Sequence, residues 1–216
     1  MNATQEKIQQ YLFANGPNPF SEKNYRFLLI DFDDAADTAT VFAFLKELFP
    51  DACFFQKGKD HFLFYFHDPD FNLKELFGSI SDDFSVALRV YVSGKVSAKK
   101  PEHFRILYGA YKEFLENSPH QYMTNAELIG EVIKSDFPRL KEIRAAVLNR
   151  IAEDAQTEKL ILAMFENDLN VKRTAEAAFM HRNTVIRKLE WIKQETGLNL
   201  QRFSDAACLY WLLRSK

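Results

Sequence analysis

Two hydrophobic periods alternate along the first half of the chain. Short runs rich in aromatic and branched residues predict strands at 25–32, 52–56, 61–67 and 84–93. Apolar residues at helical spacing predict helices at 35–49, 71–80 and 101–116. The third of these strands is apolar on both faces, which is typical of a central strand covered on each side. The predicted order is βαββαβ followed by a helix, and we therefore expect an α/β sandwich.

The pattern changes at Ser118-Pro119-His120. Beyond it, residues 125–153 show helical spacing that is interrupted before Pro138, because the residue preceding a proline avoids the helical conformation. These changes divide the chain into three predicted parts. They are an α/β domain at 1–118, a helical linker at 119–155 and an all-α domain at 156–216.

The all-α part predicts four helices. Thr157 is the expected N-cap of the first, and Gly197 is the expected C-cap of the third. The second helix is short, at 171–179, and a tight break at Met180-His181 separates it from the third, at 182–196. The fourth helix, at 204–213, is expected to pack through Ala207, Tyr210 and Trp211. A short helix, a tight turn and a longer helix form the plan of a helix-turn-helix.

Composition narrows the class of protein further. The 216 residues are 47% hydrophobic and 27% charged, with only 7 Gly and 7 Pro, which excludes collagen-like and extensively disordered chains. The two cysteines, Cys53 and Cys208, are far apart and suggest neither a disulfide framework nor a zinc site. Neither a signal peptide nor an apolar run long enough to span a membrane is apparent. We therefore expect a soluble cytoplasmic protein.

Charge is distributed unevenly along the chain. Residues 1–155 hold 18 Lys and Arg against 23 Asp and Glu, whereas residues 156–216 hold 10 against 7. Within the basic part, residues 170–193 carry six cations against two acids. Such a patch fits a small nucleic-acid-binding module, although charge alone favours the alternative of a solvated helix face.

The residues of the predicted helix-turn-helix explain how it could bind DNA. Ala175 and Ala178 are small enough to let the two helices cross closely. The third helix of this part buries Val185, Leu189 and Ile192 on one face. The opposite face carries the side chains that can read a major groove, namely Arg182, Asn183, Arg187 and Lys188. Lys172 and Arg173, at the start of the preceding helix, are placed to meet phosphates.

Residues 170–200, NVKRTAEAAFMHRNTVIRKLEWIKQETGLNL, closely resemble the C-terminal helix-turn-helix of the PucR/CdaR family of bacterial transcriptional regulators. The resemblance is strongest at H-R-N-T, residues 181–184, and at T-G-L, residues 196–198. It departs from the family at Arg187, where a tyrosine is usual. The resemblance implies DNA binding and adds Thr174, His181 and Thr184 to the set of expected DNA-binding residues.

The family often carries a degenerate GGDEF-like domain before this module, and the βαββαβ order looks like one. The run 58–62, GKDHF, stands where a diguanylate cyclase has its GGDEF loop, and Asp31 ends the first strand where a cyclase has a metal-binding Asp. Lys59 and His61 replace the second glycine and the paired acid that cyclase chemistry needs. We therefore predict that the chain is not an enzyme and has no catalytic residues.

No metal or cofactor site is predicted elsewhere in the α/β part. Asp31, Asp33 and Asp34 could hold a cation, but acidic residues after a strand more often cap the next helix or face water. His61 and His67 are too far apart on one strand to share an ion, and both are expected at the surface or an edge. The cysteines are expected to be small buried apolar residues, and Trp191 and Trp211 packing anchors.

The sequence thus predicts a sequence-specific DNA-binding transcriptional regulator. Its partner is double-stranded DNA, and because a single module binds weakly at physiological salt, we expect a homodimer. The N-terminal domain would supply dimerisation or signal input, and the identity of any small-molecule effector is left open. Two alternatives remain. One is a nucleotide-binding receptor or enzyme acting through the GGDEF-like domain, and the other is a protein-interaction adaptor.

Overall fold

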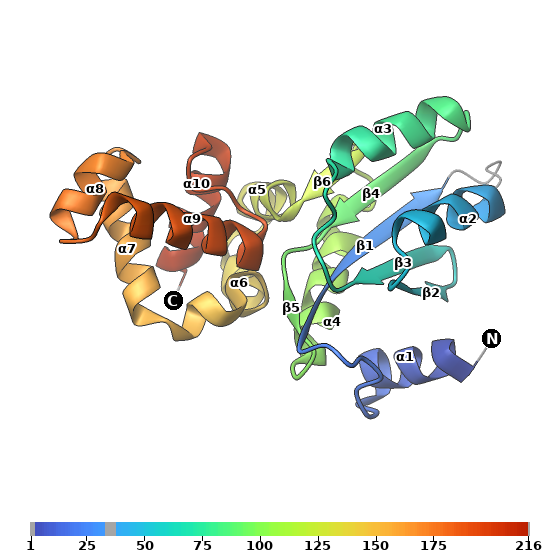
Figure 1. The fold of residues 1–216 in the computed structure, drawn as a ribbon. Helices are drawn as coiled ribbons and strands as arrows, with labels where there is room; N and C mark the ends of the chain where they lie inside the picture. The colour runs from blue at the N-terminus through green and yellow to red at the C-terminus, as the bar shows by residue number, and fades with distance from the viewer. Residues whose placement is uncertain (1–2, 33–37, 216) are drawn as a thin grey trace. The chain divides into compact units, whose positions relative to one another are not determined.

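The fold is described from a computed structural model, which covers residues 3–32 and 38–215 (Figure 1). The chain forms two compact units. The sheet unit comprises Met1–Ser93, Ser97–Pro101 and Asn117–Thr124, and the helical unit comprises Gly94–Val96, Glu102–Glu116 and Asn125–Lys216. Each unit is therefore built from separate segments of the chain. The division into domains at 118 and 155 stays a prediction.

The sheet unit is built around one central strand, β1 (Asn24–Phe32). Strand order is β2-β3-β1-β4-β6, with β1 antiparallel to both β3 and β4, and β4 parallel to β6. The other elements of this part of the chain are α1 (Ala3–Ala14), α2 (Thr38–Leu48), β2 (Cys53–Lys57), β3 (Asp60–Tyr65), α3 (Leu73–Asp83), β4 (Leu88–Val92), β5 (Val96–Ser97) and β6 (Tyr122–Thr124). The predicted βαββαβ order and the α/β fold class are confirmed.

The two faces of the sheet are both apolar, as the sequence of β3 predicts. One face packs against α2 and α3 (Figure 1), and its buried core includes Leu28, Ile30, Val41, Leu45, Leu63, Phe77, Ile80 and Val90. On the other face, aromatic rings dominate. The ring of Phe20, which follows α1, lies 5.5 Å from the ring of Phe64 and 5.5 Å from that of Tyr11. Burial on both faces explains why this part of the chain uses so many phenylalanines.

Some side chains of the sheet unit differ from expectation. His61 is half-buried rather than at the surface, with its ring 5.0 Å from the ring of Phe42 and 5.4 Å from that of Phe32. This burial lowers the pKa of His61. Cys53 is half-buried, and burial raises the pKa of its thiol. His67 is exposed, as expected, beyond the end of β3. Asp33 and Asp34 lie outside the described residues.

The helical unit contains a series of short helices. They are α4 (Pro101–Ala110), the π-helical turn η1 (Tyr111–Leu115), α5 (Asn125–Ser135), the short helix η2 (Phe137–Arg139), α6 (Leu140–Leu148), the short helix η3 (Asn149–Glu153), α7 (Ala155–Glu166), α8 (Val171–Ala177), α9 (Arg182–Thr196) and α10 (Phe203–Arg214). The predicted break before Pro138 is confirmed. No helix among the described residues has the length and apolar character needed to cross a bilayer.

Two predictions about the helical unit were wrong. Asp154, not Thr157, caps α7, and Thr157 is instead buried in the first turn of that helix. In α10 the buried face carries Ala206, Leu209, Leu212 and Leu213 rather than Ala207, Tyr210 and Trp211. Trp211 is 41% exposed, with its ring 5.4 Å from the ring of Phe137. It therefore contacts a neighbouring ring without being a buried anchor.

Candidate nucleic-acid interface

The helix α8 is held at both ends by local hydrogen bonds. At its start, the side-chain oxygen of Asn170 accepts hydrogen bonds from the backbone N–H groups of Lys172 and Arg173, at 3.0 and 3.1 Å. Asparagine is among the best residues for this capping role. At its end, the chain leaves the helix through Phe179, which has a positive φ of 52°. These two ends fix the length of α8 and the direction in which the chain enters the turn.

The turn leads directly into α9. His181 caps this helix, because its Nδ1 accepts a hydrogen bond of 3.2 Å from the backbone N–H of Asn183. Val185, Leu189 and Ile192 are buried on one face of α9, as their spacing predicts. Ala175 of α8 is also buried, and the two helices pack against each other (Figure 1). The opposite face of α9 is thereby left at the surface.

That exposed face carries the side chains expected to read DNA. Arg182, Asn183 and Arg187 are exposed, and between them Ile186 is also exposed. An Arg side chain can donate two hydrogen bonds to guanine, Asn can pair with adenine, and an apolar side chain can contact a thymine methyl. In α8, Lys172 and Arg173 are exposed, and Arg173 lies 3.4 Å from the exposed carboxylate of Asp168. The surface thus combines cations with side chains suited to base edges.

Three of the residues expected to bind DNA are not fully exposed. Thr174 is 0% exposed, so its side chain lies in the core and cannot meet DNA in this structure. Thr184 is half-buried. Lys188 is half-buried too, and its ammonium group donates a hydrogen bond of 3.3 Å to the hydroxyl of Thr157. Fewer of the expected side chains are therefore fully exposed to a ligand than the sequence suggests.

The hydroxyl group that accepts this hydrogen bond belongs to the first turn of α7. The carboxylate of Asp154 accepts hydrogen bonds from the Thr157 hydroxyl, at 2.8 Å, and from the backbone N–H groups of Thr157 and Gln156. These bonds, with the charge of Lys188 nearby, lower the pKa of Asp154. Thr157, the cap that the sequence predicts, instead donates its hydroxyl hydrogen bond to the true cap, Asp154.

The Asp154→Ala variant should lower the free energy of unfolding by about 1 kcal/mol near pH 7, because it removes the N-cap of α7. Since the folded-state pKa of Asp154 is lowered, its charged form stabilises the fold above the ordinary pKa of about 4, and this contribution is lost as the pH falls. Denaturant unfolding from pH 7 down to pH 3 measures the difference. Asp154→Asn keeps an oxygen acceptor and serves as the control. A difference from the parent protein that stays constant over this range would contradict the charged cap.

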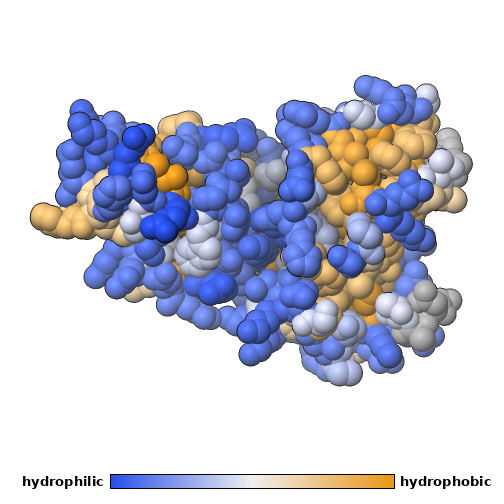
Figure 2. All heavy atoms as spheres, viewed as in Figure 1, coloured by the Kyte–Doolittle hydropathy of each residue, from blue (hydrophilic) through white to orange (hydrophobic). Residues whose placement is uncertain are grey.

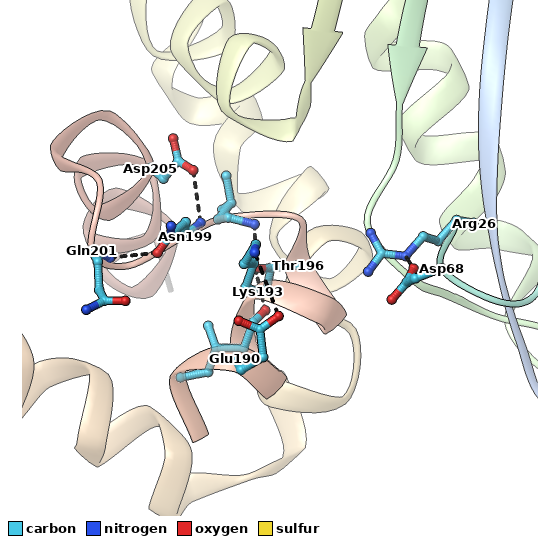
Figure 3. A network of polar contacts seen from close by, with 10 residues as sticks. Arg26, Asp68, Glu190, Lys193, Thr196, Asn199, Gln201 and Asp205 are labelled. Atoms are coloured by element: carbon cyan, nitrogen blue, oxygen red, sulfur yellow. Dashed lines mark hydrogen bonds and ion pairs between the residues drawn. The ribbon is translucent and has the colours of Figure 1, made fainter. Parts of the chain in front are cut away.

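The end of α9 is fixed as firmly as its start. Gly197 has a φ of 74°, in the left-handed region that the sequence predicts for a C-cap, and its N–H donates to the carbonyl of Lys193. Beyond it, the backbone N–H of Asn199 donates to the carboxylate of Asp205, at 2.9 Å, and the side chain of Asn199 accepts from the N–H of Gln201 (Figure 3). These bonds connect the end of α9 to the start of α10.

A buried polar cluster lies against the last turn of α9. Glu195 is buried, with 1% of the residue exposed, and its carboxylate accepts a hydrogen bond of 3.1 Å from the Asn149 amide. The ammonium group of Lys95 lies 3.8 Å from the same carboxylate, and its backbone N–H donates to the Glu195 carbonyl. The Asn125 side chain donates to the Thr196 carbonyl, at 2.8 Å. Sequence reasoning missed this cluster, because its members come from four distant segments.

The segment at Gly94 approaches the same turn very closely. A Cβ atom added at Gly94 would lie 2.7 Å from the carbonyl carbon of Thr196, closer than such atoms approach. Only glycine therefore fits here without a shift of the backbone. Residues 94–96 and Asn125 come from distant parts of the sequence, and both lie against the last turn of α9.

In the sheet unit, Asp31 and Arg89 of the neighbouring strands β1 and β4 form an ion pair. The pair joins the carboxylate of Asp31 to the guanidinium group of Arg89, and both residues line a shallow hollow with Lys59, Ser118 and Gln121. The Arg89 cation therefore neutralises the charge of Asp31, the residue that the likeness to a diguanylate cyclase associates with a metal ion. Among residues 3–32 and 38–215, no group of three or more His, Cys, Asp or Glu side chains could hold a metal ion.

The arrangement of α8, the turn and α9 defines a helix-turn-helix module. Residues 159–215 match the family model of the PucR C-terminal helix-turn-helix domain, which confirms the resemblance over this segment. Among solved structures, the chain is similar to the crystal structure of Regulator of Polyketide Synthase Expression from Bifidobacterium adolescentis. The two are 14% identical with a TM-score of 0.43, over 98% of this chain and 91% of that one. No curated protein matches the chain.

Proposed function

We propose that this chain is a DNA-binding transcriptional regulator whose α9 reads the major groove. One observation carries the proposal. In a module of the PucR helix-turn-helix type, α9 exposes Arg182, Asn183 and Arg187 while its opposite face is buried. Arginine and asparagine are the side chains best suited to guanine and adenine edges. Lys172 and Arg173 would meet phosphates and set the position of the module on the duplex.

The proposed assembly on DNA is a homodimer. A single module of this size makes few phosphate contacts, so it binds weakly at physiological salt, and two modules on one duplex multiply the affinity. Half-sites would lie about one helical turn of DNA apart, or a multiple of it. The GGDEF-like sheet unit would supply dimerisation or signal input, and we propose no catalytic reaction for it, because Lys59 and His61 stand in place of cyclase residues.

Selection of duplexes from a random pool by the full-length chain tests the proposal. A regulator of this kind should enrich a sequence with two-fold symmetry. Enrichment of no sequence, with affinity no better than about 10⁻⁴ to 10⁻⁶ M for every duplex, would instead favour the adaptor alternative.

The Arg182→Ala variant is expected to lose about 1 to 3 kcal/mol of binding to the selected duplex and to relax its preference at one base pair. Lys172→Ala should weaken binding to all duplexes alike and reduce the salt dependence, because it removes a phosphate contact. Lys141→Ala, at an exposed position of α6, makes the same change in net charge and is the control. Fluorescence anisotropy titrations at several salt concentrations measure all three. Equal affinities of the Arg182→Ala variant and the parent would exclude Arg182 from base reading.

A further inference from the structure

Phe179 is the most exposed large apolar side chain among the described residues. It is 98% exposed, and it lies in the turn between α8 and α9. Figure 2 shows apolar atoms standing clear of the hydrophilic surface at the α8 end of the helical unit. Exposing a whole phenyl ring to water gains nothing for folding, because burial is what makes such a side chain stabilising. The turn therefore carries a ring that the fold of this chain does not use.

The backbone at Phe179 makes its presence more unusual. The N–H of Met180 donates to the Ala175 carbonyl and the N–H of Phe179 to the Glu176 carbonyl, which is the pattern of a Schellman motif. In this motif the position of Phe179 is left-handed, with φ of 52° here, and glycine is the residue that normally fills it. A bulky side chain is strained in this region. Strain that a fold does not need points to a function at that residue.

The position of the ring relative to α9 suggests the function. Phe179 is two residues before the cap His181 and three before Arg182, so its Cα lies within about 11 Å of that of Arg182. About 11 Å corresponds to roughly three base-pair steps at 3.4 Å each. A side chain at the turn can therefore reach a base pair next to those that the first turn of α9 would contact.

We propose that Phe179 contacts the methyl group of a thymine in the major groove, beside the base pairs read by α9. This rests on the proposed DNA-binding function. The thymine methyl is the apolar group that base edges present in the major groove, and phenylalanine is one of the side chains that contact it. Contact with DNA would bury the exposed ring, which explains why the turn keeps a strained phenylalanine where glycine would be more stable.

Replacement of the ring separates this role from a structural one. With the full-length chain, Phe179→Gly should weaken binding to the selected duplex about tenfold, as expected for losing the burial of a large part of a phenyl ring. The same change should raise the melting temperature by about 2–4 °C, because it relieves the left-handed strain. Phe203→Gly, at an 84% exposed position at the start of α10, is the control and should leave the affinity unchanged. Equal losses of affinity in both variants, or none in either, would overturn the proposal.

Removing single thymine methyl groups identifies the contact. Each thymine of the selected duplex is replaced in turn by deoxyuridine, and both the parent protein and Phe179→Ala are titrated. At one thymine, the replacement should weaken binding by the parent about fivefold and leave binding by the variant unchanged. If the variant binds less tightly but responds to every replacement as the parent does, the thymine assignment is wrong. If the parent selects no duplex at all, it is the proposed DNA-binding function that fails.

Discussion

Replacing Lys95 with methionine is expected to lower the free energy of unfolding by about 3 kcal/mol. The carboxylate of Glu195 is buried, and the Lys95 ammonium group, 3.8 Å away, is the cation that the structure places beside it. Methionine keeps most of the apolar stem but removes the charge. The carboxylate would then remain buried with the Asn149 amide as its hydrogen-bond donor. Guanidinium unfolding of the full-length protein, followed by circular dichroism, measures the loss.

The neutral variant Glu195→Gln provides the matched control. Glutamine can still accept the hydrogen bond from Asn149, but it carries no charge that needs a cation. In the double variant Lys95→Met with Glu195→Gln, the loss should therefore be smaller than in Lys95→Met alone. If Glu195→Gln changes the stability equally with and without Lys95, charge does not couple the two residues and the cluster stabilises the helix through packing alone.

This cluster also shows where prediction from the sequence ends. The periodicity of Val185, Leu189 and Ile192 predicts which face of α9 is buried, and the glycine at 197 predicts where the helix stops, because both signals are local. From the sequence, Glu195, one residue before the end of α9, would be expected to be exposed like other acidic residues. Its burial depends on Lys95 and on other residues far away in sequence, and no local pattern carries that information.

The last helix illustrates a different limit. Its sequence, FSDAACLYWLLR, has apolar residues on nearly every side, so the helical period does not select a buried face. The prediction chose the face of Ala207 and Trp211, whereas the structure buries that of Ala206, Leu209 and Leu213. The N-cap of α7 failed for a similar reason. Asp154 and Thr157 both suit that role, and in the structure the Asp154 carboxylate accepts the backbone N–H groups of the first turn while the Thr157 hydroxyl donates to that carboxylate.

The candidate DNA-binding residues were named from residue type, which does not show which of their side chains are exposed. The sequence places Thr174, Arg182 and Lys188 in one short motif and gives no reason to separate them. In the structure, Arg182 is exposed, Thr174 is buried and Lys188 turns toward the start of α7. Packing decides these outcomes, because α8 is buried through Thr174 and Ala175, and the Thr157 hydroxyl in the first turn of α7 accepts a hydrogen bond from the lysine. The exposed turn residue Phe179 escaped notice, since an apolar residue in a helical pattern is normally assigned to the core.

Replacing Ala175 with leucine should destabilise the helix-turn-helix by about 2 kcal/mol and abolish selective DNA binding. Ala175 is buried where α8 packs on α9, so a larger side chain must push the two helices apart. The same shift would move Lys172 and Arg173 away from the position in which they could meet phosphates while Arg182 meets a base. Stability and recognition should therefore fail together, and thermal unfolding and duplex titration of the same preparation measure both.

The matched control lies two residues further along the same helix. Ala177 is exposed, so Ala177→Leu introduces the same side chain without meeting the partner helix. It should leave the melting temperature nearly unchanged, since surface substitutions away from special features change stability by about 0.5 kcal/mol or less. An Ala175→Leu variant as stable as this control would mean that the helices do not cross closely at Ala175. In that case, the relative position of Lys172 and Arg182 would not depend on a small residue between the helices. The proposal that close packing of α8 on α9 lets these two side chains contact DNA together would then be wrong.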